Sequence, residues 1–360
     1  MKWFLLATTA IGILSGTIGK RLYDEWQHRA WLAAQRRIHD EITAVNGNVD
    51  LRDGAVIEVR LGRATDHRCI ALLKGATELR ELSADIPASD AEYLWLQGHP
   101  QLRTLCVMGS EVTDNTLERI GTCSQLSSLS IGQTTITDDG LSHLRGLESL
   151  ENLTLGKMKL SGSGLKYLER LPRLKTLRLI NCPICDEALE HVGNLRGLTS
   201  LDLTGTAITG AGLPQLSQLQ SLRELTLNGT TLIHGDGLAE LDGVTRLSIA
   251  EAHFGPGVLR AVAQMDSLKY LLVYRTNVTD DLLAELKDAR QFRQLFLVQT
   301  QITDAGLVHL ESLKQLRVLM VRQTKVTPEG AERLSQALPN TTIFYSDRFF
   351  GPKWDPRADH

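Results

Sequence analysis

A period of 24 residues organises most of this 360-residue sequence. The segments LSSLSIGQTTITDDGLSHLRGLES from Leu126, LTSLDLTGTAITGAGLPQLSQLQS from Leu198 and FRQLFLVQTQITDAGLVHLESLKQ from Phe292 match position for position. Nearly every step between units is 24 residues, and the units begin at residues 79, 102, 126, 150, 174, 198, 222, 244, 268, 292 and 316. A fixed period of this length predicts stacked repeats, because one unit has no core of its own and must pack on its neighbours.

Each unit contains a strand pattern followed by a helix pattern. The first, fourth and sixth positions are apolar, as in Leu126, Leu129 and Ile131, which indicates a short strand with one buried face. Apolar residues then recur every three positions, which indicates a helix, and a threonine such as Thr137 or Thr209 stands where that helix would begin. The sequence therefore predicts an α/β fold: a horseshoe-shaped solenoid with a concave parallel β-sheet and convex helices, preceded by an N-terminal helix.

The pattern LxxLxLxxTxITDxGLxxLxxL resembles the leucine-rich repeat, in the form common in bacterial membrane-anchored repeat proteins and similar to the repeats of F-box proteins. The resemblance covers roughly residues 56–345 and implies a horseshoe that binds a protein or another large ligand. Threonine replaces the family's usual asparagine at the ninth position, so we expect an inward ladder of hydroxyl groups that satisfies turn backbone there. We see no F-box-like segment before the repeats, so a role in ubiquitin ligation is not implied.

The sequence suggests four segments: 1–21, a transmembrane anchor or signal segment; 22–46, a juxtamembrane helix; 47–345, the leucine-rich repeat domain with about eleven repeats and end caps; and 346–360, a C-terminal tail. Residues 3–19 carry no charge and would reach about 25 Å as a helix, slightly short of a hydrocarbon core of about 30 Å. We favour a single-pass membrane anchor over a cleaved signal peptide or a soluble amphipathic end. Basic residues after it favour a cytoplasmic domain but leave the side of the membrane unknown.

Composition and motifs argue against several classes of function. The formal net charge is −3, so no excess of basic residues predicts a nucleic-acid ligand. No H-E-x-x-H, G-x-S-x-G or phosphate-loop motif occurs. His143, His191 and His309 share one slot of three different helices, where we expect solvated side chains. We therefore expect no catalytic residue, no metal site, no cofactor and no small-molecule substrate.

Cys182 and Cys185 form a C-x-x-C spacing. Cys182 falls in the ninth slot and should point inward as a small buried residue, whereas Cys185 falls where a helix should begin. A zinc site would need a second pair of ligands, and none lies at a suitable spacing. A redox role stays open, because a helix start can lower the pKa of Cys185.

The third, fifth, seventh and eighth positions of each unit should face the concave surface. In the early units these residues are small and polar, as in Ser128 and Gly132, whereas in the late units they become aromatic, aliphatic or basic. Neighbouring strands lie about 4.8 Å apart, so the late residues should form one exposed apolar patch with arginines at its margin. This late concave patch consists of Arg246, Tyr270, Leu272, Tyr274, Arg275, Gln294, Phe296, Val298, Val318, Met320, Arg322 and Phe344.

Tyrosine, phenylalanine, methionine and arginine are enriched at protein interfaces, so we predict that the late concave patch binds a protein partner. A competing interpretation is that the tail folds back and covers the patch with Phe349, Phe350 and Trp354, or that these aromatics only seal the last repeat. An extra residue in the seventh unit, followed by a step of 22 residues, also predicts a local bend near residues 232–246.

The function that we favour from the sequence is a non-catalytic protein-binding scaffold tethered to a membrane. Two other classes stay open. One is a thiol-dependent enzyme or redox protein that uses Cys182 or Cys185, and the other is a structural, self-associating envelope protein.

Overall fold

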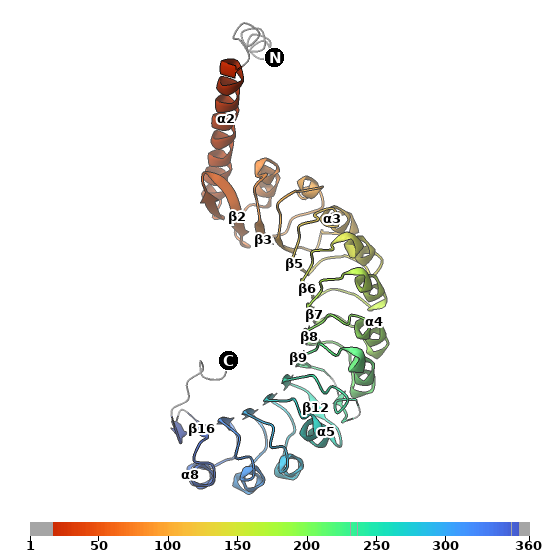
Figure 1. Ribbon diagram of the computed structural model, residues 1–360, viewed down its shortest axis with the longest axis vertical. Helices are drawn as coiled ribbons and strands as arrows, with labels where there is room; N and C mark the ends of the chain where they lie inside the picture. The colour runs from red at the N-terminus through yellow and green to blue at the C-terminus, as the bar shows by residue number, and fades with distance from the viewer. Residues whose placement is uncertain (1–16, 231, 236, 347, 353–360) are drawn as a thin grey trace.

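A single long sheet lines the inner side of an arc, and short helices line its outer side (Figure 1). The computed structural model describes residues 17–230, 232–235, 237–346 and 348–352. The 15-stranded sheet follows the chain from one end of the arc to the other. The predicted α/β horseshoe is therefore confirmed, with its concave sheet and its convex helices.

The strands are β1 (Asn48–Arg52), β2 (Ala55–Leu61), β3 (Glu81–Asp85), β4 (Thr104–Met108), β5 (Ser128–Gly132), β6 (Asn152–Gly156), β7 (Thr176–Ile180), β8 (Ser200–Asp202), β9 (Glu224–Thr226), β10 (Leu232–Ile233), β11 (Arg246–Ala250), β12 (His253–Phe254), β13 (Tyr270–Tyr274), β14 (Gln294–Val298), β15 (Val318–Met320), β16 (Thr342–Tyr345) and β17 (Arg348–Phe350). The α-helices are α2 (Thr17–Ala44), α3 (Asp114–Ile120), α4 (Leu189–Gly193), α5 (Val258–Gln264), α6 (Asp280–Leu283), α7 (Asp304–Leu307) and α8 (Pro328–Ala337). The 3-10 helices are η1 (His67–Gly75), η2 (Leu94–Leu96), η3 (Gly140–Gly146), η4 (Ser163–Arg170), η5 (Asp186–Ala188), η6 (Gly210–Gln218), η7 (Ala284–Leu286) and η8 (Val308–Leu310).

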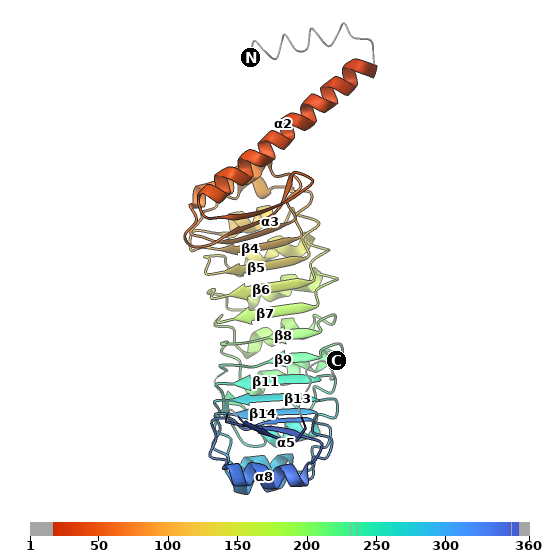
Figure 2. The same cartoon turned by 90° about the vertical axis from the view of Figure 1, so that its left-hand side faces the viewer.

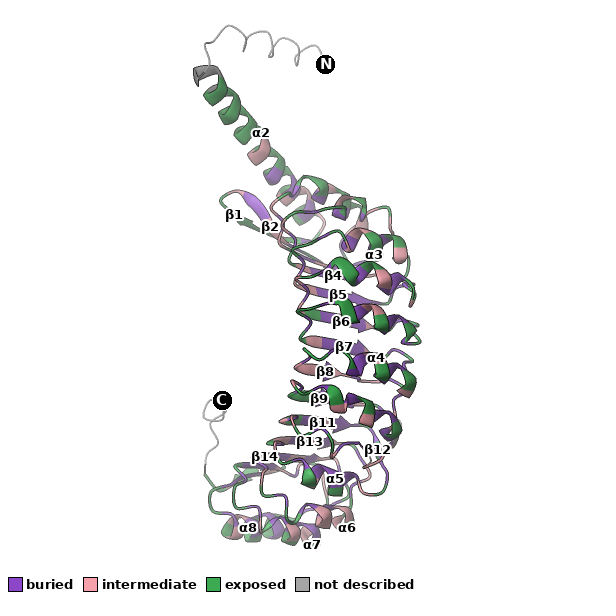
Figure 3. Ribbon diagram, turned by 45° about the vertical axis from the view of Figure 1, so that its right-hand side comes forward, coloured by how far each residue is buried: buried purple, intermediate pink, exposed green. Residues whose placement is uncertain are grey.

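Successive units pair strand against strand, in parallel and in register. Leu129 of β5 pairs with Leu153 of β6, which in turn pairs with Leu177 of β7. These leucines are buried, and the residues between them face the concave side, as the period of two along a strand requires. Figure 2 looks onto this concave face, and Figure 3 shows buried residues between the sheet and the helices.

The convex helices are short, and many are 3-10 helices. Leu141, Leu144 and Leu147 are all buried and recur every three residues. That spacing matches the three residues per turn of a 3-10 helix better than the 3.6 of an α-helix. The helix type of η3 therefore follows from the same leucines that predicted a helix.

A ladder of aspartate and threonine side chains joins several helix starts to the next unit, although glycine takes the place of the aspartate in the fourth and sixth units, at Gly162 and Gly210. The Asp280 carboxylate accepts hydrogen bonds from the backbone N–H and the hydroxyl group of Thr303, both over 2.7 Å. The same hydroxyl group accepts from the backbone N–H of Ala305, so the predicted cap threonine also links two units. The remaining Asp-to-Thr pairs of this kind are Asp90 with Thr113, Asp114 with Thr137, Asp186 with Thr209, and Asp304 with Thr327.

The glycine of the recurring ITDxG sequence leaves room for this carboxylate. A Cβ atom added to Gly306 would overlap Oδ1 of Asp280, and one added to Gly330 would overlap Oδ1 of Asp304. The aspartate and the glycine of the repeat sequence are therefore in contact across neighbouring units. In these two pairs, the aspartate of one unit occupies the space that a side chain at the glycine of the next unit would need.

The ninth-position threonines face the interior, as we expected where threonine replaces the family's asparagine, but they do not all form the same bond. Thr134 and Thr276 are buried, and their hydroxyl groups have no hydrogen-bond partner among the described residues. The other hydroxyl groups donate to the carbonyl oxygen three residues earlier, over 2.7 to 3.4 Å, and belong to Thr206, Thr230, Thr300 and Thr324.

The helix α2 and the β1–β2 hairpin close the N-terminal end of the array. The helix spans residues 17–44 rather than the predicted 22–46, and it buries Gln35, Ile38 and Ile42. The Gln35 side chain donates to the carbonyl oxygen of Gly75 over 2.8 Å and accepts from the N–H of Val56 over 3.2 Å. The N-terminal part of α2 projects away from the sheet (Figure 2). This helix therefore caps the first unit.

Most of the predicted membrane anchor, residues 3–16, lies outside the described residues. Among the helices that the structure does describe, none is both long enough and apolar enough to cross a bilayer.

The seventh unit interrupts the regular array at the place where the sequence has its 22-residue step. There β9 pairs with β11, and the short β10 pairs with β12 in a separate two-stranded sheet. Gly210 occupies the slot of the ladder aspartate in the sixth unit, so the Asp-to-Thr ladder pauses after Thr209 and resumes at Asp280.

Replacing Gly306 with alanine should destabilise the array by about 1 to 3 kcal/mol, because the new Cβ atom displaces the Asp280 carboxylate from Thr303. Gly146→Ala is the matched control, since the nearest atom would lie 3.6 Å from its added Cβ. Urea denaturation of both variants measures their free energies of unfolding. An equal effect of the two substitutions would contradict the ladder contact.

The array should lose stability in acid through Asp138. Burial raises the pKa of this carboxyl group, but hydrogen bonds from Gly164, Ser161 and Gly162 outweigh it, and the net pKa lies below the ordinary value. A carboxylate with a lowered folded pKa stabilises the fold above its unfolded pKa of about 3.9 and loses that contribution as pH falls further.

The free energy of unfolding should therefore decrease below about pH 4, and it should decrease less steeply in Asp138→Asn. Urea titrations at a series of pH values measure both slopes. Identical slopes in the two proteins would show that Asp138 does not contribute to the acid sensitivity.

Candidate functional site

The structure brings most of the late concave patch together on one face of the last units. The alternation along β13 buries Leu271 and Val273 and leaves Tyr270, Leu272 and Tyr274 half-buried. The strand register aligns three rows: Arg246, Tyr270, Gln294 and Val318; Leu272, Phe296, Met320 and Phe344; and Tyr274 with Val298.

Three side chains stack along the patch, and we call Arg246, Tyr270 and Phe296 the aromatic stack. The guanidinium carbon of Arg246 lies 4.2 Å from the centroid of the Tyr270 ring, within the range of a cation–π contact. The Tyr270 ring centroid lies 5.0 Å from that of Phe296, with 39° between the ring planes. Burial raises the pKa of Tyr270, although Arg246 lowers it, so the phenol stays protonated at neutral pH and can donate a hydrogen bond.

Arg275 and Arg322 lie at the margin of the patch. The Arg275 guanidinium carbon lies 6.0 Å from the centroid of the Tyr274 ring, and its Nη1 donates to Oε1 of Glu251 over 2.6 Å. The Arg322 guanidinium carbon lies 5.8 Å from the centroid of the Phe344 ring, and its Nε is buried with no hydrogen-bond partner in the part of the chain that the structure describes. The half-buried apolar rows are therefore bordered by basic groups.

Val318 does not belong to the exposed patch, and its prediction as an exposed residue is wrong. It lies in the expected row but is 0% exposed, and its neighbour Thr342 in β16 is 2% exposed. After β16 the chain turns back, and β17 pairs antiparallel with β16. The Thr342 hydroxyl group then donates to the carbonyl oxygen of Pro352 over 2.5 Å, so the C-terminal segment passes over this end of the row.

The same turn agrees in part with the competing interpretation, in which aromatic residues of the tail cover the patch or seal the last repeat. The Phe349 ring centroid lies 6.0 Å from that of Phe344, and Phe350 packs against the core. Phe349 nevertheless stays 49% exposed, and Trp354 lies outside the described residues. β17 therefore seals the last unit and leaves the aromatic stack partly exposed.

Two acidic residues of this surface were missed in the sequence. Glu224 lies 3.5 Å from Arg246, and Glu251 lies 2.6 Å from Arg275, measured between carboxylate oxygen and guanidinium nitrogen. Each glutamate occupies the position of its arginine one unit earlier, so opposite charges in the same slot of consecutive units are the signal that would have found them. All four side chains are about half exposed, and exposed pairs of this kind are typically worth under about 1 kcal/mol.

The two cysteines of the C-x-x-C spacing lie where the repeat predicted them. Cys182 is fully buried, and Cys185 is exposed at the start of η5. Burial raises the pKa of the Cys182 thiol, and a hydrogen bond with Glu187 raises that of Cys185. Among the described residues no group of three His, Cys, Asp or Glu side chains is placed to hold a metal ion.

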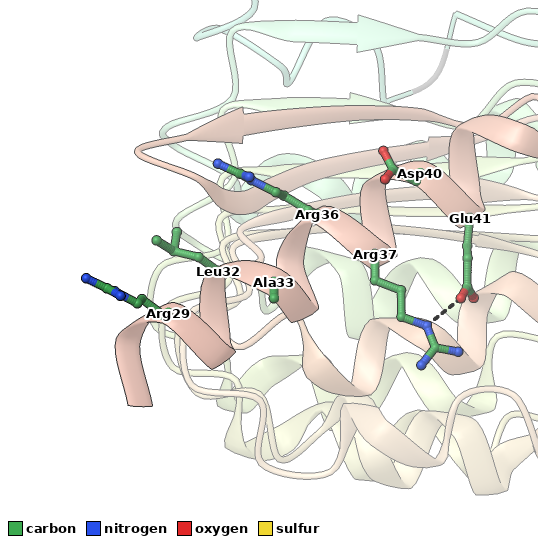
Figure 4. Close-up of a pocket in the computed structure, with 7 residues that line it drawn as sticks. All are labelled: Arg29, Leu32, Ala33, Arg36, Arg37, Asp40 and Glu41. Atoms are coloured by element: carbon green, nitrogen blue, oxygen red, sulfur yellow. Dashed lines mark hydrogen bonds and ion pairs between the residues drawn. The ribbon is translucent and has the colours of Figure 1, made fainter. Parts of the chain in front are cut away.

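A groove runs along the surface of α2 (Figure 4). The Arg37 Nε donates to Oε1 of Glu41 over 2.5 Å at one end of it. Such a groove lies on a single helix and lacks the enclosing walls of a typical small-molecule site. Its lining residues are Arg29, Leu32, Ala33, Arg36, Arg37, Asp40 and Glu41.

Comparison with known proteins agrees with the fold. The family model described as "Leucine Rich repeat" matches residues 196–214. The crystal structure of an internalin from Listeria monocytogenes is similar to the chain with a TM-score of 0.59 at 19% identity, over 90% of this chain and 91% of that one. A leucine-rich repeat protein from Leptospira interrogans has a TM-score of 0.49 at 19% identity, over 83% of this chain and 93% of that one.

No curated protein matches the sequence. At 19% identity, the likeness to the internalin shows the fold alone. The long, mainly parallel sheet, the recurring unit and the matched repeat agree with that fold, and the chain has the leucine-rich repeat fold.

Proposed function

We propose that this chain is a non-catalytic scaffold that binds a protein partner through its late concave patch and is tethered to a membrane by its N-terminal segment. Leucine-rich repeat proteins serve as protein-binding scaffolds, and the concave sheet is the extended surface that such a solenoid offers to a large ligand. The observation that carries the proposal is the aromatic stack. Its two rings are half-buried at concave positions of the late units, whereas the equivalent positions of the early units hold small polar residues.

The composition and rigidity of the patch support a protein partner. Tyr270 and Phe296 are fixed on neighbouring strands, so they lose little conformational freedom when a partner binds. Tyrosine and arginine are over-represented among the residues that dominate binding energy. The half-buried apolar rows with arginines around them also have the anatomy of a protein interface, an apolar centre with a polar rim.

Both thiols are poorly suited to a thiol-dependent reaction. The thiolate is the reactive form, and the raised pKa values of Cys182 and Cys185 reduce its share at neutral pH. This observation favours the scaffold over the thiol enzyme.

Support for the membrane tether comes from the sequence and from α2. Residues 3–19 are uncharged, and Lys20 and Arg21 follow them. The next residues of α2 include Tyr23, 44% exposed, and Trp26, 57% exposed, which are residue types that favour the headgroup region.

The full chain should therefore stay with cell membranes after alkaline carbonate washing and should be released by detergent, because an apolar helix would sit in the hydrocarbon core. A chain that lacks residues 1–19 is the control and should stay in the wash. Immunoblots of the two fractions measure the distribution. Release of the full chain by carbonate alone would refute the tether.

A photoreactive amino acid at Leu272 should crosslink to the partner in the cells that make this protein, because Leu272 lies within the patch. Tyr274→Ser combined with Phe296→Ser should abolish the adduct, because the double substitution removes two aromatic rings from the patch. Mass spectrometry identifies the adduct, and circular dichroism checks that the variant remains folded.

Two controls make this experiment specific. Val308→Ser combined with Leu94→Ser removes apolar side chains that are 59% and 57% exposed on other helices, and the adduct should survive. A probe at Thr154, on the early concave face, should give no adduct. The patch is not the binding site if the Tyr274 and Phe296 variant keeps the adduct or if the Thr154 probe yields as much of it.

A further inference from the structure

The last described residues already lie over the concave face. The strand β17 runs antiparallel to β16 and carries the chain back to the level at which β16 begins. The side chain of Thr342 belongs to the same row as Val318, and its hydroxyl group donates to the carbonyl oxygen of Pro352. The residues after Pro352 therefore start beside a row that leads to Tyr270 and Arg246.

The side chains of this row become more exposed with distance from Pro352. Thr342 and Val318 are almost completely buried, Gln294 and Tyr270 are half-buried, and Arg246 is exposed. The covered end of the row thus lies next to the C-terminal segment, and the open end carries Tyr270 and Arg246 of the aromatic stack.

Residues 353–360, which lie outside the described residues, are long enough to reach that open end. Eight extended residues span at most about 26 Å at about 3.3 Å each. The step from β16 to β11 crosses β15, β14 and β13, and four strand spacings of about 4.8 Å amount to about 19 Å.

The sequence of this segment, KWDPRADH, suits the surface. Trp354 is the second residue after Pro352, so two extended residues of about 3.3 Å each and its own long side chain can bring its ring to the half-buried Phe296. Phe296 lies two strand spacings from β16, and offset or edge-on pairs of aromatic rings are favourable there. Asp355 and Asp359 offer carboxylates to the arginines that border the patch, where charge-assisted hydrogen bonds can form.

We propose that residues 353–360 are an intramolecular ligand of the late concave patch and compete with the protein partner for it. The competition rests on the proposed function, whereas the contact of the tail with the patch does not. A tethered segment of this length binds at an effective concentration of the order of millimolar, so weak contacts suffice to occupy the surface.

The test places a photoreactive phenylalanine analogue at Trp354 in the full chain. Crosslinks within one chain should map to β13, β14 or β15, with a yield that does not depend on protein concentration. Tyr270→Ser combined with Phe296→Ser should reduce the yield several-fold, and Val308→Ser should not change it. Absence of crosslinks to these strands, or a yield that rises with concentration because a second copy supplies the tail, overturns the proposal.

A second measurement separates this proposal from the proposed function. A chain that ends after Pro352 should give several-fold more partner adduct from the Leu272 probe than the full chain, because its patch is uncovered. An unchanged adduct yield overturns the competition but leaves the partner site intact. If no partner adduct forms in either chain, the proposed function fails, and the Trp354 crosslinks still decide whether the tail occupies the patch.

Discussion

Each unit of this protein is held by the units beside it, because a short strand and a short helix cannot bury both of their apolar sides alone. Backbone hydrogen bonds join the strands, and the aspartate and threonine ladder joins the helix starts on the other side of the core. The two sets of bonds fix the same register. As a result, residues one unit apart become neighbours in space, and a surface can be assembled from side chains that are distant in the sequence, such as Tyr270 and Phe296.

The positions of side chains within a unit were predictable, whereas the side-chain contacts between units and the cover beyond the last unit were not. The buried leucines, the concave positions and the inward Cys182 all follow from their slots in the unit. The role of Asp280 was missed because its hydrogen bonds cross to the next unit, and an acidic residue at a helix start is unremarkable by itself. Val318 was misplaced because its cover comes from the segment after the last repeat, where the period no longer applies.

At the irregular seventh unit, both the residue types of the concave surface and the aspartate and threonine ladder change. The ladder pauses between Thr209 and Asp280, and within that interval the concave surface changes from small polar residues to Arg246 and the rings that follow it. Regular units on each side keep their own register, so the two halves of the surface can differ without disturbing the core. Whether the axis bends here stays a prediction.

Both ends of the sheet are closed by elements that do not belong to the repeat, α2 with its buried Gln35 at one end and β17 at the other. A change in the number of repeats can therefore occur only in the interior of the array. Each copy added or deleted between α2 and β11 would move the aromatic stack relative to α2 by one strand spacing, about 4.8 Å, without altering either surface. Repeat number thus sets the separation between the N-terminal helix and the aromatic stack, and natural variation in length would tune this separation while leaving the chemistry at both places unchanged.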